Sequence, residues 1–132
     1  MSWMDCVINK ASVESIFPTE PLLAGVRMHE VQFHQDGPSV LLRFDLSAFP
    51  DSPPKKWVAS NFNRVQLVLR FGGIADVSLE GWATDNIGDI ELVKDGSGVR
   101  MRFLAVSSRL ECHATVVDVG KISGYCSTSA TI

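Results

Sequence analysis

Alternation of apolar and polar residues dominates the chain after Gly25. It is clearest in Val40–Leu46 and Val65–Phe71, where every second residue is apolar. This period of two predicts strands with one face buried and one face in water. Less complete alternation extends the prediction to Val26–Gln35, Ala75–Trp82, Ile87–Lys94, Val99–Val106 and Leu110–Gly120. The pattern therefore predicts about seven strands.

The stretch Val26–Gln35 is the least regular of these. Its apolar positions change parity between Met28 and Val31. Such a change indicates a β-bulge or an edge strand. An edge strand can pair with its own copy, so this stretch leaves a homodimer open.

The connections between the strands are short and contain turn-forming residues. They are Asp36-Gly37-Pro38, Gly72-Gly73, Thr84-Asp85-Asn86 and Asp95-Gly96-Ser97-Gly98. Links of this kind join antiparallel neighbours, and no helix-length segment separates the strands to allow a parallel crossover. We expect a mainly β domain of the α+β type, spanning residues 1–132 as an antiparallel meander in a curved sheet or sandwich.

Helical structure is expected only at the margins of this sheet. Apolar residues in 3–17 recur at helical spacing until Pro18, which predicts one or two short N-terminal helices. Residues 47–62 contain three prolines and predict a loop with at most a turn of helix. The terminal segment 127–132 is expected to fray.

Composition places the chain among soluble, single-domain proteins. It has 132 residues, 45% hydrophobic, with a formal net charge of −3. The acidic balance argues against nucleic-acid binding, and no apolar run is long enough for a membrane span. The N-terminus lacks the pattern of a signal peptide, and three cysteines without C-x-x-C spacing suit reduced thiols. These features predict a cytoplasmic protein.

The sequence offers little catalytic or metal-binding chemistry. His29 and His34 are five residues apart and would point to opposite faces of a strand, as would Cys112 and His113. No nucleophile motif or phosphate-binding glycine loop is present. We therefore expect no catalytic residues, no metal, no cofactor and no enzymatic activity.

One segment has an uneven distribution of charge. Between residues 76 and 95, six acidic residues accompany the single base Lys94: Asp76, Glu80, Asp85, Asp89, Glu91 and Asp95. On neighbouring strands of a meander, these carboxylates would form an acidic sheet face. Such a face is either an ordinary solvated surface or a docking surface for a basic partner.

Trp82 lies at the end of this acidic strand. Its parity matches that of Asp76 and Glu80, which predicts an exposed position on the polar side. Exposed tryptophan is enriched in interface hot spots, although packing under a loop is an equal alternative. We therefore expect a partner-binding set of Asp76, Glu80, Trp82, Asp85, Asp89 and Glu91.

A pattern of residues extends over most of the chain: Asn9, Phe17, Asp36-Gly37-Pro38, Leu42-Arg43-Phe44-Asp45-Leu46, Pro53-Pro54-Lys55-Lys56-Trp57, Asn63, Val65, Leu67, Gly81-Trp82, Ala114, Ile122 and Tyr125. Through these residues the chain resembles the immunity protein 50 family of bacterial polymorphic-toxin systems. This resemblance covers most of its length. It implies an antitoxin that binds the C-terminal domain of a cognate toxin, and it brings no catalytic residues.

Four residues of this pattern are expected to be structural: Pro53, Pro54, Trp57 and Asn63. The alternative is that their loop itself plugs the toxin's cleft, since a proline-rich loop loses little entropy on docking. The main rival to the antitoxin is a small-molecule-binding β-domain. A closed cavity would favour this rival, whereas a filled core with an exposed acidic face would favour the antitoxin.

Overall fold

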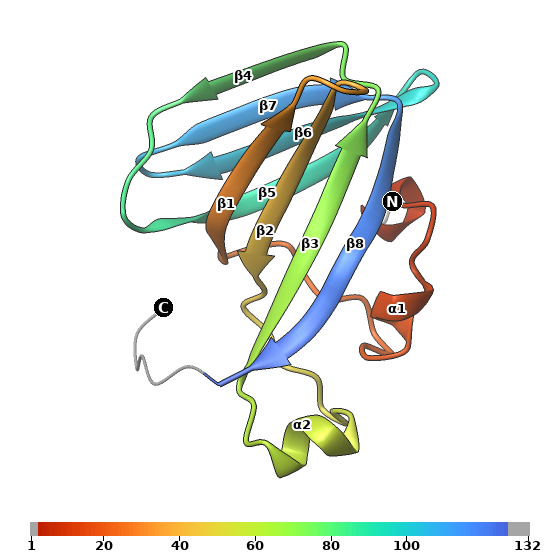
Figure 1. The fold of residues 1–132 in the computed structure, drawn as a ribbon, viewed down its shortest axis with the longest axis vertical. Helices are drawn as coiled ribbons and strands as arrows, with labels where there is room; N and C mark the ends of the chain where they lie inside the picture. The colour runs from red at the N-terminus through yellow and green to blue at the C-terminus, as the bar shows by residue number, and fades with distance from the viewer. Residues whose placement is uncertain (1–2, 127–132) are drawn as a thin grey trace.

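The computed structural model describes residues 3–126, which form one antiparallel sheet of eight strands with short helices at its margins (Figure 1). The helical elements are the 3-10 helix η1 (Trp3–Cys6) and the helices α1 (Ala11–Glu14) and α2 (Lys55–Ala59). The strands are β1 (Val26–His34), β2 (Ser39–Asp45), β3 (Arg64–Gly72), β4 (Asp76–Glu80), β5 (Asn86–Asp95), β6 (Gly98–Ala105), β7 (Arg109–Ala114) and β8 (Val116–Tyr125). The predicted fold class is confirmed. The segment 127–132, predicted to fray, lies outside the described residues.

The strands follow the order β4-β7-β6-β5-β1-β2-β3-β8 across the sheet. Two three-stranded meanders, β1-β2-β3 and β5-β6-β7, form as expected. The single continuous meander is wrong, because β4 pairs with β7 and β8 pairs with β3. Each meander is thus extended by the strand that follows the other one in the chain.

The two places where the chain changes between the meanders lie side by side. Thr115, between β7 and β8, donates its backbone N–H to Gly72 O at 2.9 Å, at the end of β3. Its hydroxyl donates to Gly73 O at 3.2 Å. Thr115 also splits the predicted strand Leu110–Gly120 into β7 and β8, so the described sheet has one strand more than predicted.

β1 joins the two halves of the sheet, which cross at a steep angle in Figure 1. Its pairing with β5 is limited to Val26–Met28, and its register on β2 shifts between Met28 and Glu30. The bulge predicted in this strand is confirmed. β1 lies between β5 and β2, so the alternative of an edge strand is wrong, and with it the argument for a homodimer through this strand.

The core lies on the inner faces of both halves. Its members include the inward apolar residues of β2, β3, β6 and β7, and Phe44, Phe71 and Phe103 are fully buried. Burial of apolar surface on this scale is the main force that holds such a sheet together. The N-terminal segment adds Trp3, whose indole N–H donates to Pro21 O at 2.8 Å. No helix within residues 3–126 is long and apolar enough to cross a bilayer.

The cysteines are free thiols in two environments. Cys6 and Cys112 are buried, whereas Cys126 is exposed. Burial raises the pKa of Cys112 to about 12. Within residues 3–126, no cluster of three or more His, Cys, Asp or Glu side chains is arranged to hold a metal ion.

Candidate protein interface

The first two residues of the predicted acidic set lie on β4, an outermost strand of the sheet. All five residues of β4 are exposed. Asp76 and Glu80 pair in register with His113 and Arg109 of β7, on the outer face of the sheet. Neither carboxylate forms an ion pair or a hydrogen bond within the described residues. The edge strand therefore presents two unneutralised negative charges.

The predicted continuous acidic face does not form. It required the strands now labelled β4 and β5 to be neighbours, but β6 and β7 lie between them. These intervening strands carry arginines on the same outer face. Arg102 is in register with Glu91 but forms its ion pair with Glu111 at 2.7 Å. Charge on this face is therefore mixed, and Glu91 is separated from the acidic edge.

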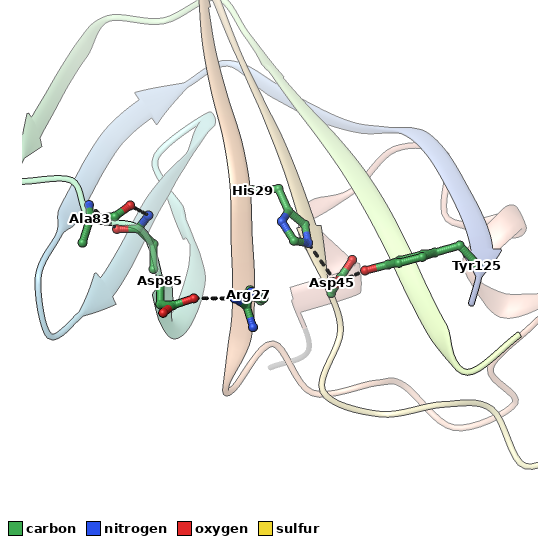
Figure 2. Close-up of polar contacts among 7 residues, drawn as sticks. Arg27, His29, Asp45, Ala83, Asp85 and Tyr125 are labelled. Carbon is green, nitrogen blue, oxygen red and sulfur yellow. Dashed lines mark hydrogen bonds and ion pairs between the residues drawn. The ribbon is translucent and has the colours of Figure 1, made fainter. Parts of the chain in front are cut away.

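Two other members of the set have internal partners. Asp85 forms an ion pair with Arg27 on β1, and both side chains are drawn in Figure 2. Asp89 Oδ1 accepts the backbone N–H of Gly25 at 2.9 Å, just before β1 begins. Because these carboxylates hold the chain around the β1–β5 junction, they are less available to a partner than Asp76 and Glu80.

Trp82 is exposed, as predicted, with 47% of its surface accessible. The prediction that Trp82 lies on the polar side of its strand is wrong. β4 ends at Glu80, and Gly81 has a φ of 72°, a left-handed conformation that breaks the alternation. Trp82 consequently lines a groove together with Leu79 from the inner side of β4.

A buried asparagine holds the loop that carries Trp82. Asn86 Oδ1 accepts the backbone N–H of Ala83 at 3.0 Å, and its Nδ2 donates to Ala83 O at 2.7 Å. Ser108 adds a hydroxyl hydrogen bond to Asn86 Oδ1 at 3.0 Å. Sequence reasoning placed Asn86 only in a turn. The nearest signal was its position directly after Asp85 within the acidic segment, which does not reveal this role.

Two open grooves lie between β4 and β1. The first has a volume of about 310 Å³ and is lined by His29, Glu30, Val31, Leu79 and Trp82. The second, of about 230 Å³, lies toward the other end of β4. It is lined by Phe33, His34, Pro38, Ser39, Val40, Ile74, Ala75, Asp76 and Val77. The inner side of β4 is therefore open to the surface, and its apolar residues Val77 and Leu79 line these grooves opposite apolar and polar groups of β1.

The residues of the proline-rich motif have packing contacts. Trp57 lies in α2 with its ring centroid 6.1 Å from that of Phe49 and 6.4 Å from that of Phe62. Pro54 precedes the helix and accepts the N–H of Trp57 at 2.9 Å, while Pro53 is half-buried beside it. The separate Asn63 donates its backbone N–H to Tyr125 O at 3.0 Å. Because Trp57 is buried, this loop offers a partner no exposed aromatic anchor from the motif.

Sequence reasoning missed a polar cluster that links β1, β2 and β8 (Figure 2). Asp45 is only 3% exposed, and its Oδ2 lies 2.8 Å from His29 Nε2. The Tyr125 hydroxyl donates to the same oxygen. The residues are far apart in sequence, and only the family resemblance drew attention to Asp45 and Tyr125. The contacts support a structural role, because they join three strands near the bulge in β1.

The environment of Tyr125 raises its pKa to about 12, chiefly through burial and then through the hydrogen bond and negative charge of Asp45. The raised value means that the folded state favours the neutral phenol. The resulting stabilisation is complete below the ordinary tyrosine pKa of 10.0 and is lost as the pH rises to about 12.

Asp45→Asn is expected to lower the pKa of Tyr125 but to leave it above the ordinary value, because burial remains. The phenolate absorbance reports this directly, since Tyr125 is the only tyrosine in the chain. The unfolded protein in urea provides the reference midpoint. An unchanged midpoint in a folded Asp45→Asn variant would contradict the assigned cause.

This chain is thus a small, mainly β domain with an exposed sheet edge that is apolar on one side and acidic on the other. Comparison with family models identifies its class. The chain belongs to the immunity protein 50 family, whose model matches residues 9–125. Comparisons with curated proteins and with solved structures gave no match. Membership of this family supports an immunity role and implies a protein partner.

Proposed function

We propose that this protein is an antitoxin that binds the C-terminal toxin domain of a cognate bacterial polymorphic toxin and blocks it by occlusion. The observation that carries the proposal is the family match over residues 9–125. The antitoxin acts in the cytoplasm of the cell that produces the toxin. Its own contribution is binding, without catalysis.

The interior of the sheet favours this function over a small-molecule-binding domain. The rival needs a cavity between the two halves of the sheet. Phe44, Phe71 and Phe103 occupy this interior and are fully buried. The grooves beside β4 are instead open at the surface, where a protein partner has access to them.

The partner-contact surface is centred on β4 and its following loop. Asp76 and Glu80 supply negative charge, which accelerates encounter with a basic partner. Trp82 supplies a large apolar anchor, and such anchors account for slow dissociation. Asp85 and Asp89 contribute mainly by holding the surrounding chain, and Glu91 lies outside this central surface.

Co-expression with the C-terminal domain of the toxin-like protein encoded beside this gene tests the function. We expect growth rescue, and we expect the two proteins to copurify as a stable complex. A catalytically inactivated toxin domain serves as the copurification partner where the active domain is too harmful to produce. If both proteins are shown to be folded, the absence of both rescue and a complex would contradict the proposal for this toxin.

A further inference from the structure

One edge of the sheet is covered by another part of the chain, and among the described strands the other edge is free. The β8 edge is covered by the N-terminal segment, where Ile8 donates its N–H to Val117 O at 3.0 Å. The Asn9 side chain continues this cover, accepting from Val119 N–H at 2.6 Å and donating to Val119 O at 3.0 Å. Within the described chain, β4 has β7 as its neighbour on one side and no strand on the other. A free strand edge presents unpaired backbone N–H and C=O groups.

The inner side of β4 is apolar where it approaches this free edge. Val77 and Leu79 are in register with the fully buried Cys112 and Leu110, yet they are 42% and 40% exposed. Across the grooves, β1 contributes Phe33, which is 52% exposed. A strand protected only against aggregation would carry charge and little exposed apolar surface. The apolar inner side is instead typical of an interaction surface.

The outer side of β4 has the opposite character. Asp76 and Glu80 alternate with Val77 and Leu79, so the strand is acidic on one side and apolar on the other. Arg109, the cross-strand neighbour of Glu80, lies 3.7 Å from Glu111 and forms its ion pair there. Glu80 therefore remains free to attract a cation from the other direction.

We propose that β4 binds an extended segment of the toxin domain as an added antiparallel or parallel strand. Apolar and basic side chains alternate along this toxin segment. Backbone hydrogen bonds to β4 would supply affinity, and side chains at every second position would supply specificity. The apolar side chains enter the two grooves, one beside Leu79 and Trp82 and the other beside Val77. The Lys or Arg side chains lie beside Asp76 and Glu80, as opposite charges do on neighbouring strands. This inference rests on the proposed function and specifies how the partner is held.

Matched substitutions test the two sides of β4 in the complex with the neighbouring toxin domain. Leu79→Ala is expected to raise Kd about tenfold, whereas Leu104→Ala, at a leucine of similar exposure on β6, should change it less than about twofold. Glu80→Lys is expected to raise Kd about tenfold at low salt. Glu91→Lys reverses another exposed charge, on β5, and should have little effect.

Amide hydrogen exchange tests the backbone pairing itself. Strand addition should slow exchange at alternate amides within Asp76–Glu80 by about tenfold or more in the complex. Both matched pairs must also keep the melting temperature of the free protein. A complex in which β4 exchange is unchanged and Leu79→Ala and Glu80→Lys behave like their controls would overturn the inference while leaving the antitoxin function intact.

Two other outcomes have distinct meanings. If the wild-type protein forms no complex with the toxin domain, the proposed function fails for that toxin, and strand addition fails with it. In the isolated protein, the protection of β4 amides from exchange could instead increase with protein concentration, and sedimentation could show a dimer. In that case a second copy of the chain occupies the edge of β4. That result would overturn addition of a toxin strand.

Discussion

Phe103→Ala is expected to lower the free energy of unfolding by about 3–5 kcal/mol. The side chain lies in β6, is completely buried, and is in register with Ile90 on one neighbouring strand and Leu110 on the other. Its truncation removes buried apolar surface and leaves a cavity that the paired strands β5 and β7 on either side of β6 cannot close. Urea denaturation followed by tryptophan fluorescence measures the loss.

Leu104→Ala is the control for this prediction. Leu104 is the next residue of the same strand, but it points to the outer face and is 44% exposed. A substitution at such a position usually changes stability by no more than about 0.5 kcal/mol. Equal costs for the two variants, with equal denaturant dependence, would contradict the assigned faces of β6.

The faces of the strands could be predicted because side-chain direction is a local property. Alternation in β6 gives the inward position of Phe103 without knowledge of any neighbouring strand. Pairing partners are not local. The same pattern is compatible with β4 beside β5 or beside β7, and the turns at Gly72 and Asp85 do not distinguish them. The break at Thr115 has no glycine or proline to mark it, so one long strand was expected.

Because strand pairing is not a local property, the acidic residues of the candidate site could not be placed correctly from the sequence. The acidic residues all lie between residues 76 and 95, and a simple meander would have gathered them on one face. The actual order inserts two strands between Glu80 and Glu91. The exposure of Trp82 could be predicted from its neighbours, but its direction depends on the backbone of Gly81. The cluster around Asp45 depends on contacts across three strands, which no local pattern encodes.

Gly88→Ala is expected to lower the free energy of unfolding by about 3 kcal/mol or more, the upper range for overpacking. Gly88 lies where β5 pairs with both β1 and β6, opposite Val26 and Ala105. A Cβ at this position would lie 2.0 Å from Leu104 O and 2.7 Å from Leu104 C. These are backbone atoms, so the clash cannot be relieved by turning a side chain, and the strands must separate.

Gly96→Ala separates this clash from the general cost of replacing a glycine. Gly96 has a φ of 64° in the β5–β6 turn, and an added Cβ would meet nothing within 4 Å. Its cost should therefore be the left-handed backbone penalty alone, about 1 kcal/mol.

Hydrogen exchange provides the second readout. Gly88→Ala should accelerate exchange in Val26–Met28, because these residues form the described pairing between β1 and β5, and Gly96→Ala should leave it unchanged. Equal stability and exchange in the two variants would show that the junction tolerates a side chain.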